Sequence, residues 1–261
     1  MKILFIGTGA MGEAVLKSVT DNLNNDEISI INRNLLKSKK ISEKYNCKFL
    51  TQFEEIKSIK FDIYIIGVRP IDINQVLIDL DKIDISNSLI ISMVNALSIS
   101  TIQSAFIKSK DISIIRMIPN MNAIIGKSLT SYTTFGSDIK IIQKGVNILK
   151  TFGEIFGINE ENYPSFVTLT GTSPAYIFAF LNAFEEFGIE NNYEPKFLKE
   201  LIAKQFINTI ENWKNNDKKT VELISEICVP NGSTIAGYEV LLENKFNNIV
   251  KKCLNKSKEK C

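Results

Sequence analysis

The sequence predicts an α/β protein with an N-terminal, doubly wound parallel sheet and an all-helical C-terminal domain. Up to about residue 135, short runs rich in isoleucine and valine alternate with amphipathic stretches. Such alternation is typical of a parallel sheet that helices cover on both faces. After about residue 160 the apolar residues recur at helical spacing. We expect a first domain over residues 1–160 and a second over residues 161–261.

The elements of the first domain follow from its apolar runs, and the right-handed connections expected between parallel strands give the doubly wound order. The second domain has four amphipathic stretches whose dense apolar spacing favours a helical bundle, with sharing between subunits left open. Strands are expected at 2–7, 27–32, 47–50, 61–68, 88–94, 112–119 and 128–135, and helices at 11–23, 34–46, 72–80, 98–109, 138–152, 173–190, 194–214, 217–227 and 234–257.

Composition excludes several classes of function. The net charge is +2, from 31 basic and 29 acidic residues, which argues against nucleic acid or an acidic membrane surface as the main partner. No stretch approaches the ~20 apolar residues that a membrane span needs, and the first strand is not a signal peptide. The four cysteines are scattered, which favours a reducing cytoplasm. Histidine is absent, which excludes classical zinc sites and histidine bases, so no metal site is expected.

The stretch GTGAMG (7–12) follows the first strand and opens a helix. Gly7 permits a tight turn, Gly9 lets the backbone approach a pyrophosphate, and Gly12 allows close packing of helix on strand. Ala10 and Met11 begin the helix, whose unpaired N–H groups attract an anion. The pattern in this position predicts a Rossmann-like dinucleotide-binding domain.

The residues after the second strand indicate which dinucleotide binds. An NAD site places a carboxylate there to accept from the ribose 2′-OH, whereas this chain has Asn32 and Arg33, with Lys37 further on. Amides and cations bind a 2′-phosphate that a carboxylate would repel. NADPH is therefore favoured, with NADH possible. Alternatively, Arg33 and Lys37 are only the solvated start of a helix, and the preference is weak.

Two more strand ends carry candidate cofactor residues. Val68, Arg69 and Pro70 end one strand at the carboxyl edge, where open sheets bind ligands. Arg69 is either a phosphate or substrate contact or a surface cation. Pro119 and Asn120 follow the RMI run, where they lie beside the nicotinamide or simply form a turn.

The chemistry is narrowed by what the first long helix of the second domain lacks. A hydride enzyme that acts on an alcohol needs a positioned proton-transfer group, and β-hydroxyacid dehydrogenases use a lysine on this helix. Residues 169–188 contain no lysine, and the chain has no histidine. A protonated imine is already electrophilic, so reduction of a C=N bond tolerates this absence.

A second candidate anion site lies in ICVPNGSTIAGY (227–238). The turn Asn231-Gly232-Ser233-Thr234 precedes an expected helix that begins near Ile235, so its backbone N–H groups offer a site for a carboxylate. Ser233 or Thr234 also suits a plain N-cap.

Five motifs in order, GTGAMG, VRP, RMIPN, TLTGTSPAYIF and VPNGSTIAGYEVLLENKF, resemble the pyrroline-5-carboxylate reductase family over essentially the whole chain. The resemblance implies NAD(P)H-dependent reduction of 1-pyrroline-5-carboxylate to L-proline, the last step of proline biosynthesis. It also implies a helical domain that interlocks two subunits, as a homodimer or a dimer-based decamer.

Residue by residue, the resemblance implies that Asn231, Gly232, Ser233 and Thr234 bind the substrate carboxylate. Thr234 would also bond the ring nitrogen as the catalytic residue. Thr172 matches the segment near the substrate. Asn32 and Arg33 would contact the 2′-phosphate.

Three departures from the family pattern leave other functions open. Val229-Pro230-Asn231-Gly232 stands where Ser-Pro-Gly-Gly is usual, Thr172-Ser173 stands where Ser-Gly is usual, and Arg69 replaces a lysine. The alternatives are a non-catalytic, NADP-binding sensor or scaffold and an NADP-dependent 3-hydroxyacid dehydrogenase.

Overall fold

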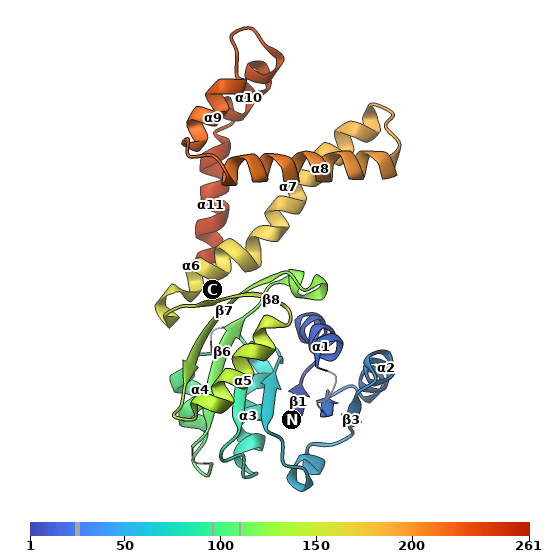
Figure 1. The fold of residues 1–261 in the computed structure, drawn as a ribbon, viewed down its shortest axis with the longest axis vertical. Helices are drawn as coiled ribbons and strands as arrows, with labels where there is room; N and C mark the ends of the chain where they lie inside the picture. The colour runs from blue at the N-terminus through green and yellow to red at the C-terminus, as the bar shows by residue number, and fades with distance from the viewer. Residues whose placement is uncertain (24–26, 96, 110) are drawn as a thin grey trace. The chain divides into compact units, whose positions relative to one another are not determined.

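The computed structural model describes residues 1–23, 27–95, 97–109 and 111–261, which form two compact units. The first comprises Met1–Gly171 with Cys261, and the second Thr172–Lys260 (Figure 1). Within the described residues of the first unit, one sheet has the order β3-β2-β1-β4-β5-β6-β7-β8. The strands are β1 Lys2–Ile6, β2 Glu27–Ile31, β3 Lys48–Leu50, β4 Ile63–Ile66, β5 Leu89–Ser92, β6 Ser113–Ile118, β7 Ser128–Phe135 and β8 Gly153–Gly157.

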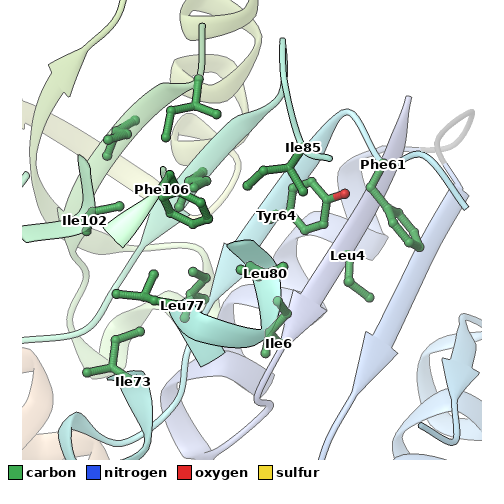
Figure 2. Packing of buried hydrophobic residues seen from close by; sticks show 14 of the residues in the cluster. Leu4, Ile6, Phe61, Tyr64, Ile73, Leu77, Leu80, Ile85, Ile102 and Phe106 are labelled. Carbon is green, nitrogen blue, oxygen red and sulfur yellow. The ribbon is translucent and has the colours of Figure 1, made fainter. Parts of the chain in front are cut away.

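The sheet of the first unit is buried on both faces. Successive residues of its central strands point to opposite sides, and an apolar cluster lies on each side. Leu4 and Ile6 lie in one apolar cluster, and Ile3 and Phe5 lie in the other. Figure 2 shows the first cluster, in which Leu77 packs near strand residues. A strand buried on both faces needs an unbroken apolar run, so the predicted doubly wound sheet is confirmed.

Helices from both halves of the sheet cover its two faces. Buried residues of α3, α4 and η1 join the first cluster, and those of α1, α2 and α5 join the second. The helices of this unit are α1 Ala10–Asn22, α2 Leu35–Tyr45, η1 Phe53–Ser58, η2 Pro70–Asp72, α3 Ile73–Asp81, α4 Ile99–Ala105, η3 Met121–Ile125, α5 Ile139–Lys150, η4 Glu160–Asn162 and α6 Tyr163–Val167, followed by the π-helical segment η5 Thr168–Thr172.

The sheet has a switch point beside its first strand. β1 pairs in parallel with β2 on one side and with β4 on the other, so the chain builds outward in one direction and then crosses back. Where the connections from two neighbouring strands run to opposite sides of the sheet, a crevice forms at the carboxyl ends of the strands. Ligands of open α/β sheets bind in this crevice. The turns after β1, β2 and β4 therefore define the place to look for a nucleotide site.

The far edge of the sheet differs from the prediction. β7 runs antiparallel to β6, because the short η3 connection is too short for the crossover that a parallel pair requires. β8 was not predicted from the sequence, since GEIFG is short and has a glycine at each end. Its first residue, Gly153, has φ +146°, and a Cβ there would lie 2.1 Å from the backbone oxygen of Ser128. Glycine is thus required where β8 meets β7.

The first residues after position 160 belong to the sheet unit. Tyr163 and Val167 pack with Ile118 of β6, and the Tyr163 hydroxyl donates to the backbone oxygen of Arg116 at 2.9 Å. The compact units accordingly divide between Gly171 and Thr172, later in the chain than the boundary expected after residue 160.

The second unit is entirely helical in its described residues. The expected helix over 234–257 is two helices, because Lys245 adopts a left-handed φ of 53° between α10 and α11. No helix of the described chain is long and apolar enough to cross a membrane. The helices of this unit are α7 Ser173–Glu190, α8 Pro195–Lys214, α9 Thr220–Ile227, α10 Ser233–Glu243 and α11 Phe246–Lys258.

Candidate functional site

The turn between β1 and α1 has the geometry of a phosphate-binding turn. Gly7 has φ +87°, and a Cβ there would lie 2.7 Å from the Val68 side chain. A Cβ on Gly12 would lie 2.5 Å from the backbone oxygen of Gly7, so a larger residue cannot keep this turn. Gly9 differs, because a Cβ there would meet no heavy atom within 4 Å. The fold therefore requires Gly7 and Gly12, while Gly9 leaves open space that suits a pyrophosphate.

The first turn of α1 presents unpaired backbone donors. α1 begins at Ala10, and Gly9 at the N-cap supplies no capping side chain. The first N–H groups of any helix lack intrahelical partners and lie at the positive end of the helix dipole. Ala10 is exposed and Met11 half-buried, so a ligand can approach this end of α1.

A cavity of about 540 Å³ opens beside this turn, within the range of nucleotide-binding clefts. Its walls are the ends of β1, β2 and β4 together with the residues that follow them. The lining includes Gly7, Thr8, Gly9, Asn32, Arg33, Lys37, Gly67, Val68, Arg69, Asp72 and Asp79. Of the predicted cofactor residues at these strand ends, six line the cavity, namely Gly7, Gly9, Asn32, Arg33, Val68 and Arg69, whereas Ala10, Met11, Gly12 and Pro70 do not.

Asn32 lines this cavity with its amide already engaged. Its Oδ1 accepts from the backbone N–H of Thr8 at 2.6 Å and from the Thr8 hydroxyl at 3.0 Å. Its Nδ2 donates to the hydroxyl of Ser38 at 3.1 Å. Asn32 therefore ties the end of β2 to the phosphate turn, and the 2′-phosphate contact expected of it stays a prediction.

Arg33 and Arg69 meet at one carboxylate. Arg33 forms a two-pronged ion pair with Asp72, at 2.8 Å from Nη1 and 3.0 Å from Nη2. Arg69 donates from Nε to the same carboxylate at 3.0 Å. The side chains of Arg33 and Arg69 are 75% and 70% exposed, whereas that of Asp72 is 20% exposed. The sequence reading missed Asp72, whose signal was its position three residues after Arg69 at a helix start.

The remaining residues of the VRP motif shape the backbone at the end of β4. Val68 is half-buried against Gly7, and Pro70 is the first residue of η2. Proline suits the first helical position because its missing N–H would have had no partner there. Val68 and Pro70 thus fix the start of the segment that carries Arg69 and Asp72.

Asn120 is fully engaged in a turn. It is 3% exposed, its Nδ2 donates to the backbone oxygen of Thr170 at 3.0 Å, and its Oδ1 accepts from the N–H of Asn122 at 3.1 Å. Pro119 before it is buried. Neither residue lines the cavity described above. Pro119 and Asn120 therefore form a turn, and the contact with the nicotinamide expected of them stays a prediction.

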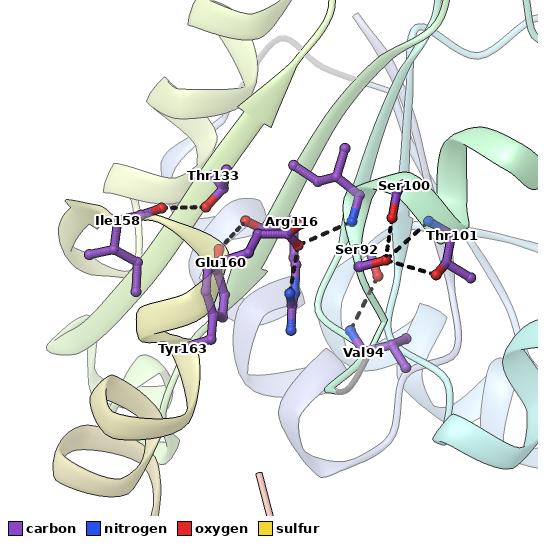
Figure 3. A network of polar contacts seen from close by, with 11 residues as sticks. Ser92, Val94, Ser100, Thr101, Arg116, Thr133, Ile158, Glu160 and Tyr163 are labelled. Atoms are coloured by element: carbon purple, nitrogen blue, oxygen red, sulfur yellow. Dashed lines mark hydrogen bonds and ion pairs between the residues drawn. The ribbon is translucent and has the colours of Figure 1, made fainter.

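The strand that precedes this turn carries a buried charged network (Figure 3). The Arg116 side chain, 8% exposed, pairs with Glu160 at 2.6 Å and lies over the ring of Tyr163, 4.2 Å from its centroid. Burial raises the pKa of Tyr163 to about 12, so its hydroxyl stays protonated at neutral pH. The network fixes η4 and α6 to β6, and the motif reading of RMIPN gave no sign of it.

In the second unit, residues 229–232 form a tight turn before α10. Asn231 has φ 59°, and the Gly232 N–H donates to the backbone oxygen of Val229 at 3.0 Å. A Cβ on Gly232 would lie 2.8 Å from the Val229 side chain. The Gly232 amide, which was expected to serve the substrate carboxylate, is therefore used inside the turn.

Ser233 and Thr234 are the first residues of α10, and Gly232 is its N-cap. The helix starts earlier than the expected Ile235, so neither hydroxyl acts as the N-cap that was considered. Both residues are exposed. Their N–H groups belong to the first helical turn, where no backbone acceptor is available. The two amides and the Thr234 hydroxyl remain as the candidate groups for an anionic ligand.

Thr172 lies at a helix junction in the chain. It ends the π-helical segment Thr168–Thr172 and is the N-cap residue of α7. Its side chain is half-buried. π-Helical turns are rare and are frequent at functional sites. Within the described residues, no group of three or more His, Cys, Asp or Glu could hold a metal ion.

Two family models match the chain, one for each part. Residues 160–261 match the model described as pyrroline-5-carboxylate reductase dimerisation. Residues 2–96 match the model described as NADP oxidoreductase, coenzyme F420-dependent. The first begins close to the boundary that the sequence predicted, and the second covers β1 to β5 with the phosphate turn.

Curated relatives and solved structures align over nearly the whole chain. Pyrroline-5-carboxylate reductase of Aquifex aeolicus is 25% identical, covering 100% of this chain and 96% of its own. Pyrroline-5-carboxylate reductase 2 of Bacillus subtilis is 27% identical, covering 98% and 92%. The crystal structure of 1-pyrroline-5-carboxylate reductase from Streptococcus pyogenes is 28% identical, with a TM-score of 0.87 over 100% of this chain and 97% of that one.

A further structure shares the fold at lower identity. Plasmodium falciparum pyrroline carboxylate reductase, solved with NADP bound, is 22% identical with a TM-score of 0.85, covering 100% of this chain and 96% of that one. The order of motifs, the two family models and these full-length relatives agree. Residues 160–261 match the pyrroline-5-carboxylate reductase dimerisation family, and the whole chain is similar to pyrroline-5-carboxylate reductases.

Proposed function

We propose that this protein reduces the C=N bond of 1-pyrroline-5-carboxylate to L-proline with NADPH, as the last step of proline biosynthesis. One observation carries the proposal. This chain has both a phosphate turn with open space at Gly9 and a helix, α10, that begins at Ser233 without a side-chain cap. The first suits a dinucleotide and the second suits a small carboxylate.

The dinucleotide site fits the group that the family implies. Gly7, Gly9 and the first turn of α1 would hold the pyrophosphate, and Arg33 with Lys37 would face the ribose that carries the 2′-phosphate. When bound, NADPH supplies the hydride. The cations around the cavity are what favour a phosphorylated dinucleotide over NADH.

The substrate site divides its work between backbone and side chain. The N–H groups of Ser233 and Thr234 would hold the carboxylate at the positive end of α10. The Thr234 hydroxyl would orient the ring nitrogen. In the balanced reaction the imine carbon gains a hydride and the nitrogen gains one proton, which comes from water either directly or through the Thr234 hydroxyl, and the hydroxyl then takes a proton back from water. No strong base is needed, in accord with the absence of lysine in 169–188.

The protein is proposed to act in the cytoplasm, on a small-molecule substrate, as a homodimer or a dimer-based decamer. Large apolar side chains of α7 are exposed in the isolated chain, among them Phe178 at 53% and Phe187 at 67%. A contiguous apolar surface of this kind is typical of an interface between subunits. The matched dimerisation model supports the same assembly.

A steady-state assay tests the proposal directly. Purified protein is given NADPH or NADH together with pyrroline-5-carboxylate or its six-membered homologue, and separately NADP+ or NAD+ together with a 3-hydroxy acid. We expect oxidation of NADPH with the five-membered imine and no reduction of NADP+ with the 3-hydroxy acid. Tight binding of NADPH with no turnover of any imine would instead support the non-catalytic sensor or scaffold.

A further inference from the structure

The carboxylate of Asp72 accepts hydrogen bonds from two arginines. Its Oδ1 accepts from Arg33 Nη1, and its Oδ2 accepts from both Arg33 Nη2 and Arg69 Nε, all between 2.8 and 3.0 Å. These bonds join the segment after β2 to the segment after β4. A bidentate guanidinium–carboxylate pair is among the strongest polar contacts at a protein surface.

The Asp72 side chain binds the two arginines and does not cap the helix that follows it. Asp72 is the N-cap residue of α3, where an aspartate usually accepts from the N–H groups of the first helical turn. Here its side chain makes no capping bond. The carboxylate instead faces the cavity that it lines together with Arg33, Lys37 and Arg69.

This arrangement conflicts with recognition of a 2′-phosphate. The two N–H groups that Arg33 donates to Asp72 are not available to a phosphate while this pair is formed, so a phosphate must displace Asp72 or use the other N–H groups of the guanidinium. A phosphate that approaches the pair also meets the negative charge of Asp72, which is only partly exposed to screening solvent. An unphosphorylated ribose meets neither obstacle, because it leaves the Arg33–Asp72 pair in place.

We propose that Asp72 is a specificity-determining residue that competes with the 2′-phosphate for Arg33 and Arg69, and so narrows the preference for NADPH over NADH. The inference rests on the proposed function, since it concerns the same dinucleotide site. The residues after β2 are usually expected to set the preference between NADPH and NADH by themselves. Here the segment after β4 would contribute to this preference as well.

The test measures nucleotide binding without turnover. Isothermal titration calorimetry compares 2′,5′-ADP, which carries the 2′-phosphate, with 5′-ADP, which lacks it. In Asp72→Asn the affinity for 2′,5′-ADP should rise about three- to tenfold, while that for 5′-ADP changes less than about twofold. If the ratio of the affinity for 2′,5′-ADP to that for 5′-ADP were the same in Asp72→Asn as in wild type, or smaller, the inference would be overturned.

Asp79→Asn is the matched control. Asp79 lines the same cavity but pairs with Lys82 at 2.6 Å and accepts from Gln75, away from both arginines. Its removal changes the net charge equally, so a general electrostatic effect would raise 2′,5′-ADP affinity in both variants. We expect the ratio of the two affinities in Asp79→Asn to stay within about twofold of wild type, and an equal rise would contradict the specific role of Asp72.

A double mutant tests whether the effect of Asp72→Asn depends on Arg33. In Arg33→Met the carboxylate has lost its main partner, so adding Asp72→Asn should raise 2′,5′-ADP affinity less than it does in wild type. An equal rise would contradict competition for Arg33. Wild-type protein that binds neither nucleotide would refute the proposed cofactor function itself, whereas binding of both with no effect of Asp72→Asn would refute this inference alone.

Discussion

Two glycines of the phosphate turn do different work, and single substitutions separate them. In Gly12→Ala the new methyl group would lie 2.5 Å from a backbone oxygen, so the turn or α1 must shift. We expect a loss of about 1–3 kcal/mol in the free energy of unfolding, together with weaker nucleotide binding. Urea unfolding and calorimetry with NADPH measure the two effects.

Gly9→Ala is the paired variant at the same turn. Its methyl group meets no atom within 4 Å and the residue has φ −64°, so the protein should unfold at the same urea concentration as wild type. The methyl would however occupy space that a pyrophosphate needs, and NADPH affinity should fall at least tenfold. Wild-type NADPH affinity in Gly9→Ala would show that the nucleotide does not approach this backbone.

Thr234 is the residue on which the proposed chemistry depends. Thr234→Ala removes the hydroxyl that would orient the ring nitrogen, and kcat/KM should fall about 10- to 100-fold with little change in NADPH affinity. Thr234→Ser, which keeps the hydroxyl at the same exposed position, should retain most of the activity. If both variants turned over at the wild-type rate, the hydroxyl would have no part in the reaction.

Residue-level reasoning from sequence succeeded where sterics alone decide. Gly7 and Gly12 have the close contacts in the turn that their spacing predicted, and the open space at Gly9 agrees with the pyrophosphate contact predicted for it. The same reasoning did not find the partners that side chains bind within the protein. Arg33 pairs with Asp72, and Asn120 bonds to Thr170, each far away in the sequence. Spacing within a motif carries no information about which distant acceptor a donor will meet.

At the scale of elements, the buried charged network on β6 gives a pH-dependent prediction. The pKa of Tyr163 is raised, chiefly by burial, from 10.0 to about 12. Below pH 10 the Tyr163 phenol is protonated in both the folded and the unfolded chain. The contribution of the buried, protonated phenol to the free energy of unfolding is therefore fully present there. As pH rises from 10 towards 12 the unfolded chain releases the proton first, and stability falls by about 2–3 kcal/mol.

Urea unfolding between pH 8 and pH 11 checks this prediction. Tyr163→Phe should be less stable by about 1 kcal/mol at pH 8, because its bond to the Arg116 oxygen is lost. It should also lose stability less steeply above pH 10. Tyr64, whose pKa burial likewise raises to about 12, keeps part of the slope in both proteins. An identical slope in wild type and variant would contradict the assignment.

Elements were predictable in proportion to how completely they are buried. The strands β1, β2, β4, β5 and β6 were predictable from their apolar runs, because nearly all of their residues are buried. β8 escaped notice because much of it is exposed and glycine stands at both ends. The break between α10 and α11 was equally invisible, because it depends on the left-handed backbone of Lys245, a residue with no special preference for that conformation.

At the scale of the whole molecule, association should depend on the apolar surface of α7. Replacing Phe178, which is 53% exposed, by aspartate would place a charge in a surface that we expect to be buried between subunits. Phe178→Asp should shift the protein towards monomer in sedimentation, while Phe178→Leu should keep the wild-type assembly. A Phe178→Asp protein that sediments as wild type would exclude α7 from the interface.

The central claim is that the protein binds the pyrophosphate of NADPH at the β1–α1 turn and uses that NADPH to reduce a small cyclic imine held at the start of α10. The most direct measurement follows NADPH oxidation and L-proline formation together, with pyrroline-5-carboxylate as substrate. We predict equal amounts of NADPH consumed and L-proline formed. Protein that binds NADPH yet forms no L-proline from pyrroline-5-carboxylate would contradict the claim.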